Sequence, residues 1–320
     1  MVASLLVAAS LYACAAPRIT LFPDTSAPLQ EFTLEGSGRD KVLLLPVSGV
    51  ISDEPDKQGM RYRPSMVQEV VAHLQRAQKD PNIKAMVLKV NSPGGSTTAS
   101  DILYHEILTY KERNGIKLVA AMMNIAASGG YYISLPADVI TAHPTTITGS
   151  VGVVFLRMKI YGLMDKIGVT AAVNTSGENK DMMSPFRAST EKEDRLIQEL
   201  TDNLAKRFFQ LVAKHRKLDD GALADVRTAR VYLAEDARKI GLIDRIGYLS
   251  DAVKEAKQIA GLAEDARVVV YRRSEFNDDN LYNTATSDTG QIEKPVVDLN
   301  LMPALDPGFY FMWAPVIGMQ

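Results

Sequence analysis

The chain has 320 residues, of which 46% are apolar and 23% are charged, as in globular proteins with a sizeable core and unlike disordered or fibrous chains. Lysine and arginine (36) nearly balance aspartate and glutamate (38), so the formal net charge of −2 lacks the positive field of a nucleic-acid-binding protein. One cysteine and four scattered histidines offer no zinc-type ligand set, and we expect neither an internal disulfide nor a structural metal.

The N-terminus begins with an apolar run, MVASLLVAASLYACA, which is short for a membrane span and typical of a signal-peptide core. The tetrapeptide LYAC, which ends at Cys14, resembles the lipobox of bacterial lipoproteins, whereas the tripeptide ACA fits ordinary cleavage after Ala15. A buried N-terminal helix is the plainer alternative, and no basic residue precedes Arg18. We predict that residues 1–15 are a signal peptide or a lipoprotein anchor, with Cys14 as the candidate lipidation site, and that the chain is exported.

The next segment, residues 16–40, carries prolines and glycines without a sustained period and is interpreted as a linker. Folded structure is expected from Lys41, where apolar runs begin to alternate with helical patterns. The helical patterns start at Pro64 and span Thr98 to Arg113. The predicted strands are KVLLLPVSGVI, IKAMVLKV, KLVAAMM, ADVITAH and TAAVNTS. Strands that alternate with helices at this spacing predict βαβ units and a mostly parallel α/β sheet.

The C-terminal part is predicted to be helical. Thr190 and Glu193 form a capping-box pattern, and apolar residues then recur at helical spacing in what should be the longest helix. Shorter elements follow, including a helix from Ser250 to Gly261. Beyond Val270 the pattern fails, and the aromatic tail PGFYFMWAPVIGMQ is expected to pack on its own core, on another subunit or on lipid. The predicted core domain is therefore residues 41–262, followed by a C-terminal extension, residues 263–320.

The stretch NIAASGGYYIS places Ser128 at a predicted turn between a strand and a helix. In α/β sheets such turns present side chains at the carboxyl ends of strands, where ligands gather. The small residues around Ser128 leave space for a substrate carbonyl, and the N–H of Gly129 is placed to donate to an oxyanion. Small-Ser-Gly-Gly is also ordinary turn chemistry, so this pattern alone leaves the role of Ser128 open.

The stretch NSPGGS ends the preceding predicted strand. If the two strands are neighbours, Gly94 and Gly95 bring backbone N–H groups toward Ser128, and a pair of donors facing one serine makes an oxyanion hole. A plain turn is the simpler interpretation of this glycine pair.

A serine nucleophile needs a base, and two residues are candidates. His143 follows a predicted strand end, although an ordinary loop histidine would do the same. Lys180 lies in the stretch SGENKDMMSPFR. A lysine acts as a base only when it is uncharged, and apolar surroundings favour the uncharged state. An ion pair with Asp181 would instead keep Lys180 charged, and this stretch alone does not decide between the two.

Four motifs, NSPGGS, NIAASGGYYIS, TGSVGVV and SGENKDMMSPFR, occur in this order in the chain. Together they resemble the signal peptide peptidase A family of Ser-Lys serine peptidases, over residues Lys41 to Gly261 and in the short, single-domain form. The resemblance implies a core like that of the Clp protease and the crotonases, with long C-terminal helices. It implies Ser128 as nucleophile, Lys180 as general base and Ser150 as the residue that orients the lysine, with Gly95 and Gly129 as oxyanion donors.

The resemblance also implies a homo-oligomeric ring in which the Ser and Lys of one site come from neighbouring subunits. Its substrates would be remnant signal peptides and other apolar, membrane-associated peptides, cleaved through an acyl-enzyme without metal or cofactor. The catalytic domain would lie in the cell envelope, anchored to the membrane and outside the cytoplasm. The alternatives are a crotonase-like acyl-CoA enzyme, a Clp-type triad with His143, and an inactive membrane scaffold.

Overall fold

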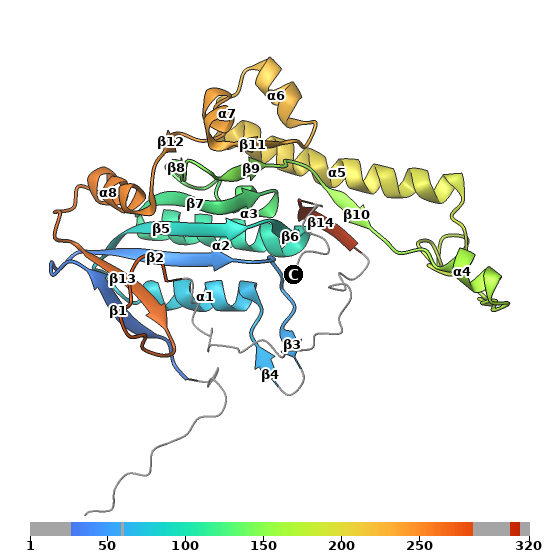
Figure 1. The fold of residues 1–320 in the computed structure, drawn as a ribbon, viewed down its shortest axis with the longest axis horizontal. Helices are drawn as coiled ribbons and strands as arrows, with labels where there is room; N and C mark the ends of the chain where they lie inside the picture. Colours follow the sequence, from blue (N-terminus) through green and yellow to red (C-terminus); the bar gives the residue numbers. More distant parts are fainter. Residues whose placement is uncertain (1–26, 59–60, 284–307, 314–320) are drawn as a thin grey trace, which may run out of the picture.

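A nine-stranded sheet forms the centre of the protein (Figure 1). The structure is a computed structural model that describes residues 27–58, 61–283 and 308–313. Its strands are β1 (Gln30–Glu35), β2 (Lys41–Ser48), β5 (Ile83–Ser92), β7 (Lys117–Ala127), β8 (Val139–Ala142), β9 (Ile147–Gly149), β11 (Val231–Leu233), β12 (Arg245–Ile246) and β13 (Arg267–Arg272). The main path runs β1-β13-β2-β5-β7-β8-β12, and β9 joins it beside the end of β7. All neighbours from β13 to β12 are parallel, whereas β1 and β11 pair antiparallel. The predicted, mostly parallel α/β core is confirmed.

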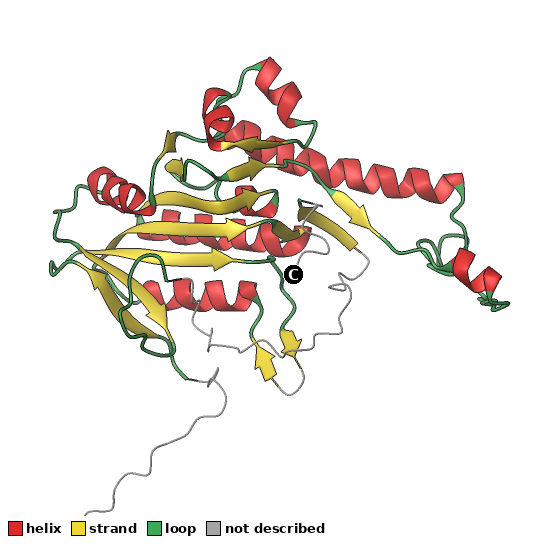
Figure 2. Cartoon of the chain, in the orientation of Figure 1, coloured by secondary structure: helices red, strands yellow, loops and turns green. Residues whose placement is uncertain are grey.

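Helices cover both faces of this sheet (Figure 2). They are α1 (Met66–Ala77), α2 (Thr97–Asn114), α3 (Gly129–Tyr132), α4 (Tyr161–Lys166), α5 (Glu191–His215), α6 (Asp220–Val226), α7 (Ala234–Lys239) and α8 (Leu249–Ile259). Alternate β2 residues face opposite ways, so Leu43 packs with α1 and α2 while Val42 packs with α8. Both faces are buried, which explains why the strands of the parallel core are continuous apolar runs.

Two small sheets complete the fold. The first has the order β10-β14-β6 and joins β10 (Val154–Leu156), β14 (Gly308–Met312) and β6 (Gly94–Ser96), all antiparallel. The second is a hairpin of β3 (Asp56–Gln58) and β4 (Arg61–Arg63). Strand β14 thus returns the C-terminal tail to the core of its own chain, which was one of the three places expected for it.

The core is larger at both ends than the predicted domain of residues 41–262. Residues 30–35, assigned to the linker, form β1, and β13 lies inside the predicted extension but between β1 and β2. Lys41 Nζ also lies 2.5 Å from Glu31 Oε1 and 2.6 Å from Asp80 Oδ2. The linker and extension boundaries were misplaced because each of these strands is recognisable only beside its partner.

The long helix was predicted correctly. Thr190 Oγ1 accepts from the Glu193 N–H at 3.2 Å and Glu193 Oε2 accepts from the Thr190 N–H at 2.8 Å, which is the predicted capping box at the start of α5. The predicted strand TAAVNTS was wrong, because residues 170–176 form no strand and are exposed. They belong to a segment, residues 157–189, that carries α4 away from the sheet; we call it the arm (Figure 1).

Among the residues that the structure describes, none of the helices is both long and apolar enough to cross a membrane. The predicted signal or anchor segment, including Cys14, lies outside the described residues.

Candidate active site

Ser128 stands at the junction between β7 and α3. Its backbone has φ 53° and ψ −113°, a conformation that costs energy for any residue with a side chain and that is common at functional sites. The side chain is 1% exposed, and its Oγ has no hydrogen-bond partner in the described part of the chain. A buried hydroxyl that forms no structural bond is free to react, as a nucleophile on a strand-to-helix turn must be.

Ser150 lies next to Ser128, directly after the neighbouring strand β9. Strands β7 and β9 are parallel, and Ala127 pairs with Gly149, so both serines directly follow a paired position. The Ser128 N–H donates to the Gly149 carbonyl at 2.8 Å, and Ser150 also has a positive φ, of 50°. The structure therefore brings together two of the predicted site residues, which are 22 positions apart in the sequence.

The glycine pair reaches the same point. A Cβ on Gly94 would lie 2.8 Å from the Gly129 nitrogen, so β6 passes the turn after Ser128 at a distance that only glycine permits. The predicted turn NSPGGS is a strand instead at Gly94–Ser96, because one edge pairs with β14 and Gly95 bridges Ile51 on the other. This fixes the backbone of Gly95, which the family resemblance implies as an oxyanion donor.

Sequence reasoning missed Ser92, whose hydroxyl holds the glycine strand in place. Ser92 Oγ donates to the Gly49 carbonyl at 2.6 Å and accepts from the Gly94 N–H at 3.1 Å. The residue is fully buried. Its position at the end of β5, two residues before the glycine, was the signal that could have identified it.

Lys180 is not near Ser128 in this chain. It is exposed, it lies in the arm, and its N–H donates to the Gly177 carbonyl at 3.1 Å. The arm projects beyond β10, away from the strand ends that carry both serines (Figure 1). Because Ser128 Oγ has no partner among the described residues, no Ser-Lys contact forms within one chain.

Asp181, next to Lys180, pairs with Arg187 and not with the lysine. Arg187 Nε lies 2.7 Å from Asp181 Oδ2, and Arg187 also forms an ion pair with Glu193 at the first turn of α5. Hydrogen bonds from Arg187 and from the Thr190 N–H lower the pKa of Glu193 to about 2. This cluster ties the lysine-bearing part of the arm to the long helix.

His143 is the other candidate base. Its N–H donates to the Met122 carbonyl at 2.9 Å, at the level of β7 six positions before Ser128. The ring contacts Thr145 Oγ1 at 2.9 Å and packs edge-on against Tyr248. His143 therefore forms no hydrogen bond with Ser128 in this structure, because the Ser128 Oγ has no partner among the described residues.

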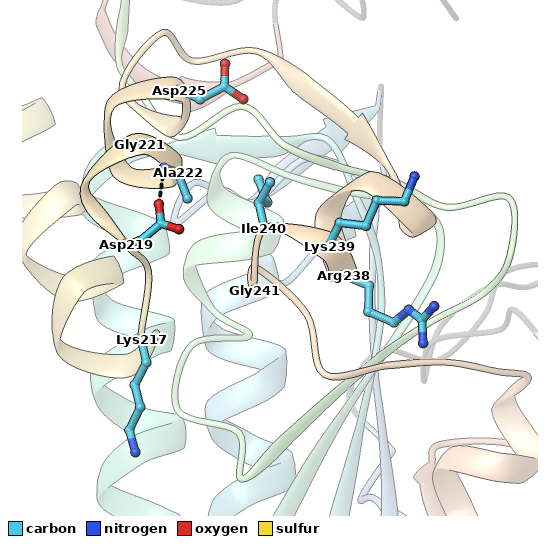
Figure 3. A pocket seen from close by; sticks show the side chains of 9 residues that line it. All are labelled: Lys217, Asp219, Gly221, Ala222, Asp225, Arg238, Lys239, Ile240 and Gly241. Carbon is cyan, nitrogen blue, oxygen red and sulfur yellow. Dashed lines mark hydrogen bonds between the residues drawn. The ribbon is translucent and has the colours of Figure 1, made fainter.

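A concave patch between α6 and α7 lies outside this site (Figure 3). Its charges are largely paired locally: Lys239 with Asp236 and Arg238 with Glu235, while Asp219 caps α6 by accepting from the Ala222 N–H at 2.7 Å. The described residues hold no cluster of histidine, cysteine and carboxylate side chains suited to a metal ion.

The sequence is similar to known peptidases. Residues 110–263 match peptidase family S49. The chain is 36% identical to a putative signal peptide peptidase SppA of Enterococcus faecium over 252 residues, which cover 79% of this chain and 73% of that protein. The chain belongs to peptidase family S49. The resemblance given by the four motifs is thereby confirmed, and the chain is a serine peptidase.

Two further relatives show how the lengths compare. A putative protease of Synechocystis sp. is 31% identical over 72% of this chain and 78% of its own length. Protease 4 of Haemophilus influenzae is 33% identical over 78% of this chain, but the match covers only 40% of that longer protein. This S49 chain therefore corresponds to most of the shorter relatives and to less than half of protease 4.

Proposed function

We propose that this S49 peptidase is an endopeptidase that uses a Ser-Lys dyad, with Ser128 as nucleophile and Lys180 as general base. The observation that carries the proposal is the strained, buried Ser128, whose Oγ has no partner among the described residues, beside the glycine strand and Ser150. Lys180 is favoured over His143 as base because the His143 ring contacts Thr145 Oγ1 and Tyr248 and forms no bond to Ser128.

In the proposed reaction, the Ser128 Oγ attacks the substrate carbonyl carbon and its proton passes to the Lys180 Nζ. The N–H groups of Gly95 and Gly129 stabilise the negative oxygen of the tetrahedral intermediate. The C–N bond then breaks, the leaving amine takes the proton from Lys180, and an acyl-enzyme remains. Water, deprotonated by Lys180, hydrolyses this ester and restores the Ser128 hydroxyl. Ser150 would hold the lysine in position.

We further propose that the Ser and Lys of one site come from two copies of the chain in a homo-oligomeric ring. One chain does not place Lys180 at Ser128, and the arm exposes large apolar side chains that water disfavours: Met158, Leu163, Ile167, Val169, Val173 and Phe186. A second copy that packs on the arm would cover these side chains and receive the lysine.

Complementation between two inactive variants tests both proposals. Ser128→Ala and Lys180→Ala should each lose activity on a denatured apolar polypeptide by several orders of magnitude. In co-expressed mixed oligomers, about a quarter of the sites would combine an intact serine with an intact lysine, and activity should return. Activity that persists in Lys180→Ala would refute Lys180 as the general base. A mixture that stays inactive would refute a site shared between two copies. His143→Ala, the control, should keep its activity.

The substrates we propose are remnant signal peptides and other apolar, membrane-associated peptides, a class that the name of the Enterococcus relative supports. We also propose that residues 1–15 direct export and that the catalytic domain works in the cell envelope, outside the cytoplasm and anchored to the membrane. The mass of the mature N-terminus separates lipidation at Cys14 from cleavage after Ala15 and from retention of the segment. A serine-reactive fluorophosphonate tests the nucleophile directly: it should label Ser128, and a wild-type protein that stays unlabelled would refute the proposed role of this residue.

A further inference from the structure

The peptide unit between Gly94 and Gly95 carries one of the two proposed oxyanion donors, and the covalent chain leaves its direction open. A peptide unit is planar and trans, so its C=O and its N–H point in opposite directions. Glycine has no Cβ to favour one direction, and the φ of Gly94 is +106°, a value that other residues rarely adopt. This peptide can therefore turn over unless neighbouring groups hold it, and only one orientation lets the Gly95 N–H serve the hole.

Hydrogen bonds to residues 49–51 select one orientation of this peptide. The Gly94 carbonyl accepts from the Ile51 N–H at 2.9 Å, and the Ser96 N–H donates to the Ile51 carbonyl at 2.9 Å. Because the Gly94 carbonyl points at Ile51, the Gly95 N–H points the other way, toward the edge of β6 that pairs with β14. Residues 49–51 therefore give the Gly95 N–H its direction.

The same edge of β6 faces the turn that carries the nucleophile. A Cβ on Gly94 would overlap the Phe311 carbonyl oxygen of β14 and would lie 2.8 Å from the Gly129 nitrogen. Gly129 directly follows Ser128 in the chain. The Gly95 N–H thus points to the side on which the second proposed donor lies, as two donors for one oxyanion must.

Ser92 holds β6 and residues 49–51 together through one hydroxyl. Its Oγ donates to the Gly49 carbonyl at 2.6 Å and accepts from the Gly94 N–H at 3.1 Å. The backbone of Ser92 also touches the nucleophile turn, because a Cβ on Gly130 would lie 2.5 Å from the Ser92 carbonyl oxygen. Ser92 is fully buried, so loss of its hydroxyl would leave both of these backbone groups without their buried partner.

We propose that Ser92 is a positioning residue for the reaction, whose hydroxyl locks the peptide between Gly94 and Gly95 in the orientation that stabilises the oxyanion. This inference rests on the proposed roles of Ser128 and Gly95. Without the hydroxyl, β6 separates from Gly49 and the peptide turns over for part of the time. Oxyanion donors act on charge that develops in the transition state, so loss of the lock lowers kcat and leaves KM nearly unchanged.

Two substitutions of Ser92 in the full-length protein separate its hydrogen bonds from its packing. Ser92→Ala removes the hydroxyl and leaves a small space, whereas Ser92→Cys fills that space with a thiol that forms only weak hydrogen bonds. Both should lower kcat on a fluorogenic peptide at least about tenfold, with KM within about threefold of the wild type. Wild-type kcat in Ser92→Cys would show that Ser92 only fills space and would overturn the proposal.

Thr146→Val is the matched control. Thr146 is fully buried, and its Oγ1 donates to the carbonyls of Met122, at 3.0 Å, and Met123, both in β7 and not in β6. This variant also loses buried hydroxyl bonds to the backbone, so its melting temperature should fall, but its kcat should stay within about twofold of the wild type. A loss of kcat equal to that of Ser92→Ala would refute a specific role of Ser92.

An ester substrate and its thionoester, in which sulfur replaces the carbonyl oxygen, report on the oxyanion hole itself. Sulfur is larger than oxygen and accepts hydrogen bonds more weakly, so donors placed for oxygen favour the ester. The ratio of kcat/KM for the ester to that for the thionoester should be at least about tenfold smaller in Ser92→Ala than in the wild type. An equal ratio in both proteins would show that Ser92 acts by another route and would overturn the proposal.

Labelling by a fluorophosphonate distinguishes failure of this inference from failure of the proposed function. If the wild type is labelled at Ser128, the nucleophile stands, and an unchanged kcat in Ser92→Ala overturns the role of Ser92 alone. If the wild type is not labelled at Ser128, the nucleophile is overturned, and with it the oxyanion hole that Ser92 would serve.

Discussion

Replacing Gly95 by alanine would put a methyl group where the structure has no space for one. A Cβ at this position overlaps the Ile51 carbonyl oxygen and lies 2.5 Å from the Ile51 carbonyl carbon. Carbon atoms in contact are about 3.5 Å apart, so β6 would have to move by about 1 Å. Because Gly95 is a proposed oxyanion donor, a shift of this size should lower kcat/KM by roughly a hundredfold.

The same overpacking should destabilise the fold by about 1–3 kcal/mol. At about 2–4 °C per kcal/mol, the melting temperature of Gly95→Ala should fall by several degrees. The assays are fluorogenic peptide hydrolysis and thermal unfolding. Gly221→Ala in α6 is the matched control: its Cβ would meet only Asp219 Oδ1, at an ordinary 3.4 Å, and activity should not change. Wild-type kcat/KM in Gly95→Ala would refute the assigned position of the oxyanion hole.

Arg187→Gln should lower kcat roughly tenfold, because it releases the Lys180 segment from α5; an unchanged kcat would contradict this role. Hydrogen bonding to Arg187 lowers the pKa of Glu193 to about 2, from 4.5 in the unfolded chain. The ionised Glu193 therefore stabilises the fold above about pH 4.5 and loses this effect toward pH 2, where urea midpoints of the wild type and Glu193→Gln should converge. Burial, and to a lesser extent the positive charge of the nearby Arg272, lowers the pKa of Lys89 to about 8. The unfolded chain binds the Lys89 proton more tightly than the folded protein does. The free energy of unfolding of the wild type, relative to that of Lys89→Met, should therefore rise between pH 8 and 10.5. A difference in stability that stays constant over this range would count against burial of the Lys89 charge.

The place of the candidate site could be predicted in part. Ser128 and Gly95 follow apolar strands, and turns at the carboxyl ends of parallel strands meet at one edge of the sheet. Ser150 was assigned only by the resemblance to the peptidase family, and the roles of all three residues stay predictions. The role of Lys180 as general base stays a prediction, because a single chain holds this residue in the exposed arm. The ion-pair partner of Asp181 could not be predicted, because the sequence places both Lys180 and Arg187 close to it and only the conformation of the arm selects Arg187.

The sequence alone determined the parallel core and the turns that carry the serines. Their signals are local: continuous apolar runs predict strands buried on both faces, and glycine pairs permit close backbone approach. Only the tertiary structure decided that β1 and β13 extend the sheet and that β14 lies between β6 and β10. Phe311 pairs with Gly95 across more than 200 residues, and nothing local to either one marks the other. A strand gains its hydrogen bonds only from a partner in space, so the position of the tail depends on the folded chain.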